Sequence, residues 1–185
     1  MVNLNKNLTI SFVGHRKFRE IEDIDKIKED LENLLESLIL NYNAKIFRFG
    51  SKSEFNVLCH KVVSKLKERY PQIYRINHTC GEFVVESKEE KEFYENALKN
   101  LHHQSYIEDY EKIIFTERVQ KAGKASYVAR NCEMIDLSDV CIFYYNKNYK
   151  LEPRSHEYKR NSGTANAYNY AKQKKKIIFN LYKNL

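Results

Sequence analysis

The chain has 185 residues, 42% of them hydrophobic, which suffices for one domain with a buried core, and we interpret residues 1–185 as a single domain. Its apolar runs fall short of the roughly 20 residues of a membrane span, and from its polar start we expect no signal peptide. We therefore expect no membrane partner and a cytoplasmic location. The formal net charge of the chain is +7, and the positive charge is concentrated from Val140 onward, a segment that contains ten Lys and Arg but only two Asp and Glu.

Strand and helix patterns alternate along the chain, and Gly14 and Gly50 each follow a strand pattern. Ser53 is a plausible N-cap for the clearest apolar stripe, and Pro71 marks the limit of that helix. In chain order, the elements predicted in this half are a strand at Leu8–Gly14, a helix at Ile24–Leu38, a strand at Lys45–Phe49, a helix at Phe55–Leu66 and a strand at Tyr74–Cys80.

The second half is less regular, and we treat residues 87–123 as a variable insert or lid within the domain. Ser87–Asn100 is charged and predicts a helix, and Ile113–Phe115 predicts a short strand. The elements predicted after the insert are a helix from Ser126 with Val128, Cys132 and Ile135 inward, a strand at Val140–Tyr145, a helix at Thr164–Lys174 and a strand at Lys176–Leu181.

This alternation predicts an α/β fold with a mainly parallel sheet and helices on both faces. In such folds, ligands bind at the carboxyl ends of strands, near the point where the strand order reverses. Gly14, Gly50 and the turn at Ser162 all follow predicted strands or their linkers. We therefore expect these three turns to converge.

The Ser162-Gly163-Thr164 turn opens a predicted helix, whose free N–H groups and dipole favour an anion such as phosphate. A plain helix cap explains the same residues. Cationic and polar residues beside the two other turns, His15, Arg16, Ser51 and Lys52, are further ligand-binding candidates. Arg16 could pair with a nearby glutamate instead, and His15 could be a packed core histidine.

The four cysteines have no Cys-x-x-Cys spacing, which indicates reduced thiols rather than a disulfide framework or a metal site. His102 and His103 lack partners at ligand spacing, so we expect neither a metal nor a cofactor. Glycine-rich dinucleotide and Walker patterns are missing from the sequence.

Several short motifs together resemble the YpsA/YoqJ-like branch of the SLOG superfamily, which is related to the lonely-guy and DprA-type proteins. The stretches that carry the resemblance are Phe12–Arg16, Phe47–Asn56, Arg130–Asn131 with Met134, Ser138 and Asp139, and Ser162–Thr164. The similarity spans Leu8 to Leu181 and is weakest between Ser87 and Gly123.

The resemblance implies a Rossmann-like domain that binds a nucleotide or a nucleotide-derived small molecule, commonly as a homo-oligomer. It adds Arg130 and Asn131 to the ligand-binding candidates, with Gly14, Gly50 and Gly163 as turn glycines. Lonely-guy enzymes carry a catalytic glutamate after their Gly-Thr turn, whereas Thr164 is followed here by Ala165, Asn166 and Ala167. By position, Glu54 and Glu133 are the candidate replacements for that carboxylate.

Three functions are compatible with these patterns. The first is a module that binds a nucleotide-derived ligand as a sensor or sequestering protein. The second is a nucleotide N-glycosidase or ribosyl-transfer enzyme that uses Glu54 or Glu133. The third is binding of single-stranded nucleic acid through the basic C-terminal third, which is less favoured because the cations are scattered.

Overall fold

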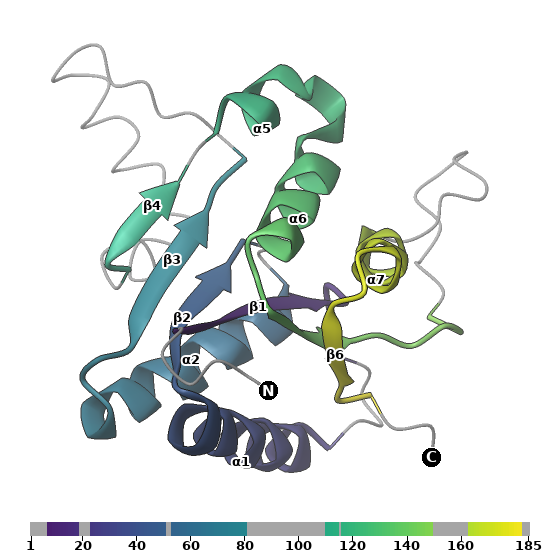
Figure 1. Ribbon diagram of the computed structural model, residues 1–185. Helices are drawn as coiled ribbons and strands as arrows, with labels where there is room; N and C mark the ends of the chain where they lie inside the picture. The colour runs from purple at the N-terminus through teal and green to yellow at the C-terminus, as the bar shows by residue number, and fades with distance from the viewer. Residues whose placement is uncertain are drawn as a thin grey trace, which may run out of the picture.

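The computed structural model describes residues 7–18, 23–50, 53–80, 110–114, 116–149 and 163–182. Within these ranges, the strands all belong to one sheet (Figure 1). The strands are β1 (Leu8–Gly14), β2 (Ala44–Phe49), β3 (Tyr74–His78), β4 (Lys112–Ile114), β5 (Val140–Tyr144) and β6 (Ile177–Asn180).

The sheet is parallel throughout and has the strand order β4-β3-β2-β1-β5-β6. The chain therefore builds outward from β1 in one direction and then crosses to β5 on the other side. This confirms the predicted α/β class and is the order of a Rossmann-like fold. The reversal falls between β1 and β5, where Ile10–Gly14 pairs with Val140–Tyr144.

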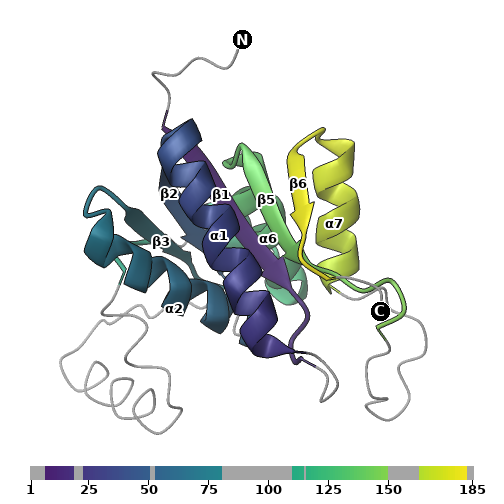
Figure 2. The same ribbon diagram turned by 90° about the horizontal axis from the view of Figure 1, so that it is seen from below.

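Helices cover both faces of the sheet, as Figures 1 and 2 show. Helices α1 and α2 lie on one face, and α6 and α7 lie on the other, with α5 beside α6. The helices are α1 (Ile24–Tyr42), α2 (Glu54–Arg69), α5 (Glu117–Lys121), α6 (Ser126–Asp136) and α7 (Gly163–Gln173), with a 3₁₀ turn at Gly123–Ala125.

The larger part of the core lies beneath α1 and α2. Phe12 of β1 stacks on Phe47 and Phe49 of β2, with ring centroids 6.3 and 5.0 Å apart. The buried cluster on the opposite face is smaller, and its Ala167 and Ala171 let α7 lie close to the sheet. Burial of aromatic and aliphatic side chains beneath α1 and α2 is therefore the larger hydrophobic contribution to the fold.

Side-chain caps define where the first two helices begin. Asp23 accepts a hydrogen bond from the Lys26 N–H at 3.0 Å, and Ser53 accepts one from the Asn56 N–H at 3.2 Å. Each such cap contributes about 1 kcal/mol. Helix α1 ends at Asn43, which adopts the left-handed conformation with φ 54°.

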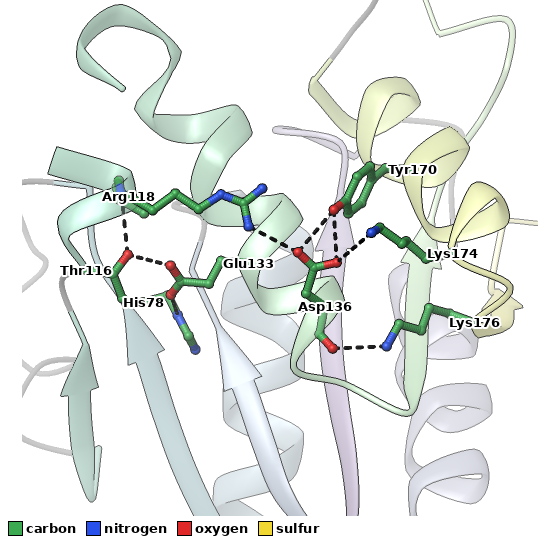
Figure 3. Close-up of polar contacts among 9 residues, drawn as sticks. His78, Thr116, Arg118, Glu133, Asp136, Tyr170, Lys174 and Lys176 are labelled. Carbon is green, nitrogen blue, oxygen red and sulfur yellow. Dashed lines mark hydrogen bonds and ion pairs between the residues drawn. The ribbon is translucent and has the colours of Figure 1, made fainter. Parts of the chain in front are cut away.

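Helices α5, α6 and α7 are joined by Asp136, the last residue of α6 (Figure 3). The Tyr170 hydroxyl donates to its carboxylate at 2.9 Å, Arg118 donates at 3.1 Å, and the Lys174 ammonium lies 3.8 Å away. Lys176 donates to the Asp136 carbonyl at 3.0 Å. Two lysines of the basic C-terminal region therefore contact this end of α6.

Two sequence predictions need correction. The third strand ends at His78 rather than Cys80. In α6, Val128 is 43% exposed and not inward, whereas Arg130 and Glu133 are buried beside Met134. The apolar pattern is misleading here because the inward face of α6 carries charged groups.

The part of 87–123 that the structure describes contains β4 and α5, and β4 agrees with the predicted short strand. The helix predicted at Ser87–Asn100 lies outside the described residues. Within the described ranges, no helix has the length and apolar character needed to cross a membrane.

Candidate functional site

The carboxyl ends of β1 and β5 meet at the reversal in strand order, where His15 joins them. The His15 N–H donates to the Tyr144 carbonyl at 3.2 Å, and the ring Nε2 accepts from the Asn146 N–H at 2.8 Å. Tyr149 stacks on the buried ring with centroids 3.9 Å apart. His15 is thus placed as a packed histidine at a strand end.

Gly14 lets the start of α2 approach the end of β1. A Cβ at Gly14 would lie 2.4 Å from a ring carbon of Phe55, a residue that is fully buried. Only glycine fits this close approach without a shift of the helix. The result is that the N-terminus of α2 lies against the carboxyl edge of the sheet.

Glu54, in the first turn of α2, holds the loop that follows β1. Its Oε2 accepts from the Phe18 N–H at 2.7 Å, and its own N–H donates to the Arg16 carbonyl at 2.9 Å. The Arg16 side chain is exposed. Glu54 therefore organises the loop, and its carboxylate already accepts a backbone hydrogen bond.

Gly50 follows β2 directly and lies beneath α6. A Cβ there would lie 2.5 Å from the Met134 sulfur and 2.9 Å from Nε of Arg130. The Gly50 N–H points to the side-chain oxygen of buried Asn56 at 3.4 Å, and Asn56 donates to the Phe12 carbonyl at 3.4 Å. Gly50 thereby leaves room for Arg130 at the carboxyl end of β2.

Arg130 is a buried cation whose side chain has neutral neighbours. It is only 4% exposed, and its Nε and Nη2 donate to Oδ1 of Asn131 at 3.3 and 3.0 Å. The guanidinium lies 5.2 Å from the centre of the Tyr127 ring. It also interacts with Cys80, and burial raises the pKa of that thiol, which keeps it neutral. Among the described residues, no carboxylate forms an ion pair with Arg130.

Glu133, one turn after Arg130, belongs to a buried chain of polar groups. Its Oε1 accepts from His78 Nδ1 at 3.1 Å, and its Oε2 accepts from the Thr116 hydroxyl (Figure 3). On its other side, His78 Nε2 lies 3.0 Å from Nη1 of Arg48. The chain therefore links β2, β3, the N-cap of α5 and α6.

Burial shifts the ionisation of this chain. Desolvation, followed by the charge of Arg48, lowers the pKa of His78 to about 4, against the opposing effect of Glu133. Desolvation also lowers the pKa of Arg48 and of Arg130, although both guanidiniums stay charged at neutral pH. Nε of Arg48 is buried and has no hydrogen-bond acceptor among the described residues.

Helix α7 also begins at the carboxyl edge, because it lies in the crossover between the parallel strands β5 and β6. Gly163 is its exposed first residue, and a Cβ there would meet no atom within 4 Å. Thr164 is buried on the face that carries Ala167. The other turn residues predicted to bind ligand, Ser51, Lys52 and Ser162, lie outside the described residues.

The structure thus brings Gly50, Arg130 and Asn131 together, and it places Gly14 and His15 at the neighbouring strand end. Sequence reasoning missed Arg48, His78 and Thr116. Both Arg48 and His78 lie within strand patterns. The signal that could have identified them is a charged or polar side chain at a strand position that faces the interior. Within the described ranges, no group of three His, Cys, Asp or Glu residues could hold a metal ion.

Comparison of the chain with protein-family models yields no match, and no curated protein matches it either.

Proposed function

We propose that the protein binds a nucleotide-derived small molecule at the carboxyl edge of its sheet, with Arg130 contacting a phosphate or another anionic group. The observation that carries this proposal is a guanidinium 4% exposed, with no carboxylate partner among the described residues. A buried charge without compensation is costly, so its retention favours a role in binding an anion. The planar donor fork of arginine matches phosphate and carboxylate oxygens.

The surroundings of Arg130 support an anionic ligand. Arg48 lies on the same side of β2, and its buried Nε is a donor that has no acceptor in the described part of the chain. Helices α2 and α7 both begin at this edge of the sheet, and helix N-termini favour anions. The resemblance to SLOG proteins supports a nucleotide-derived molecule as the source of the anion.

Binding, rather than glycosidic cleavage, is proposed because both candidate carboxylates are engaged within the protein. Glu54 accepts from the Phe18 backbone at 2.7 Å. Glu133 accepts from His78 and from Thr116, one donor for each oxygen. A general base or nucleophile needs an available oxygen near the sugar, and these bonds oppose that role.

Calorimetric titration with AMP, ADP, ADP-ribose and a cyclic nucleotide tests this proposal, with adenosine as the uncharged comparison. We expect saturable binding of at least one phosphorylated compound and none of adenosine at the same concentration. Replacing Arg130→Met should weaken binding about ten- to hundredfold, because a hydrogen bond to a charged group contributes about 1.5–3 kcal/mol.

Arg69→Met is the matched control, since Arg69 lies in the last turn of α2 and pairs with Glu36 at 2.6 Å. Helix α2 begins at the carboxyl edge, so its last turn lies toward the opposite edge of the sheet. We expect unchanged affinity in this variant. Equal losses in both variants, or no binding by the wild-type protein, would contradict the proposed function.

A further inference from the structure

The chain Thr116–Glu133–His78–Arg48 has a single consistent arrangement of protons. Arg48 has donors only, so His78 Nε2 must accept from it across 3.0 Å. His78 Nδ1 therefore carries the proton and donates to Glu133 at 3.1 Å. The Thr116 hydroxyl donates to the second carboxylate oxygen. The imidazole is neutral, and it connects the cation of Arg48 to the carboxylate of Glu133.

Glu133 also has an oppositely charged residue on its own helix. Residues three apart on a helix are neighbours on its surface, and oppositely charged pairs at this spacing attract one another. Arg130 and Glu133 have this spacing in α6, and both are buried. Arg130 nevertheless donates to Asn131, and Glu133 accepts from His78 and Thr116.

We propose that Thr116 and His78 are positioning residues that hold the carboxylate of Glu133 away from Arg130 and so keep the Arg130 charge available for the anionic group of the ligand. This inference rests on the proposed function, because it assigns the chain to the site at which Arg130 binds. Glu133 is then the partner of Arg48 through His78, and neither a catalytic carboxylate nor the counter-ion of Arg130.

The charges support this division of roles. Arg48 and Glu133 compensate one another through the neutral imidazole, which leaves Arg130 as the uncompensated charge among these groups. His78 is only 1% exposed, and its side chain experiences the charges of Arg48, Glu133 and Arg130. Removal of the imidazole would leave one oxygen of Glu133 without its donor, on the same buried face of α6 as Arg130.

The first test is AMP binding by His78→Ala, Glu133→Gln and the double variant. In His78→Ala, the freed carboxylate should pair with Arg130, and affinity for AMP should fall at least tenfold. Glu133→Gln should bind severalfold more tightly, because it removes a negative charge near the phosphate. The double variant should regain at least the wild-type affinity. A double variant as weak as His78→Ala would overturn the inference, since rescue is not expected from a general loss of structure.

The second test needs no ligand. Arg130→Met, Glu133→Gln and their combination form a double-mutant cycle, which is made once in the wild-type protein and once in the His78→Ala background. The denaturant midpoint of each variant is measured. We expect the two effects to add when His78 is present and to be non-additive in the His78→Ala background. Additive effects in both backgrounds would overturn the inference. Failure of the wild-type protein to bind AMP, ADP, ADP-ribose and the cyclic nucleotide would instead contradict the proposed function, which keeps the two failures distinguishable.

Discussion

Acidification should destabilise the protein through His78, and the effect can be followed with a variant that does not titrate. Burial lowers the folded-state pKa of His78 from 6.5 to about 4, while Arg48 and Arg130 act in the same direction and Glu133 opposes them. Because the unfolded chain binds a proton at higher pH than the folded protein does, stability is fully present above the unfolded pKa of 6.5. It is lost as the pH falls through the window between 6.5 and about 4.

The size of the effect follows from that shift. At about 1.4 kcal/mol per pKa unit, the loss contributed by His78 reaches about 3 kcal/mol by pH 4. Glutamine at position 78 can donate and accept hydrogen bonds between Arg48 and Glu133 without gaining a proton. His78→Gln should therefore lose less stability than the wild-type protein over the same range.

Urea unfolding at pH 7, 6, 5 and 4 measures this difference directly. Other titrating groups are shared by the two proteins, so the difference between their unfolding free energies isolates His78. We expect His78→Gln to gain about 3 kcal/mol relative to wild type between pH 7 and pH 4. Parallel curves for the two proteins would refute the buried neutral imidazole and, with it, the proton arrangement of the chain.

Two further predictions concern the fold. Gly14→Ala should destabilise the protein by about 1–3 kcal/mol or more, because the new Cβ would lie 2.4 Å from a ring carbon of Phe55. Gly163→Ala should change stability by under about 1 kcal/mol, because its Cβ would meet no atom within 4 Å. Similar urea midpoints for the two variants would contradict the close packing at Gly14. Burial opposes ionisation of Glu111, but hydrogen bonds from Arg75 outweigh it and lower the pKa to about 2. Stability from this pair is present above the unfolded pKa of 4.5 and is lost as the pH falls toward 2. Glu111 is exposed, so solvent screening limits the loss to about 1 kcal/mol. Glu111→Gln should flatten this part of the acid unfolding curve, and an unchanged curve would argue against the pair.

The fold was largely predictable because its strands carry simple patterns. Leu8–Gly14 and the stripe of α2 are apolar at the expected spacing, and their glycine and serine boundaries match the observed ends. Strand order could not be read from the sequence, because pairing depends on contacts between distant segments. The observed order nevertheless places the reversal beside Gly14, as expected for a sheet built outward from its first strand.

The candidate site was predictable only where a motif or a glycine marked it. Arg130, Asn131 and Gly50 were identified in this way, and the structure brings them together. Arg48 and His78 were missed because their roles depend on Glu133, which is distant in sequence. The error at Val128 has the same origin, since a helix that buries charged residues does not follow an apolar stripe.

The most direct test of the central claim is the free energy of unfolding of Arg130→Met, measured with and without AMP. A buried charge without a counter-ion destabilises a fold, so the ligand-free variant should be as stable as the wild-type protein or more stable. AMP at about 100 times its wild-type dissociation constant should raise wild-type stability by about 2.7 kcal/mol. The same concentration should raise the stability of the variant, which binds ten- to hundredfold more weakly, by only about 0.4–1.4 kcal/mol. A variant that is several kcal/mol less stable without ligand, yet equally stabilised by AMP, would contradict the account.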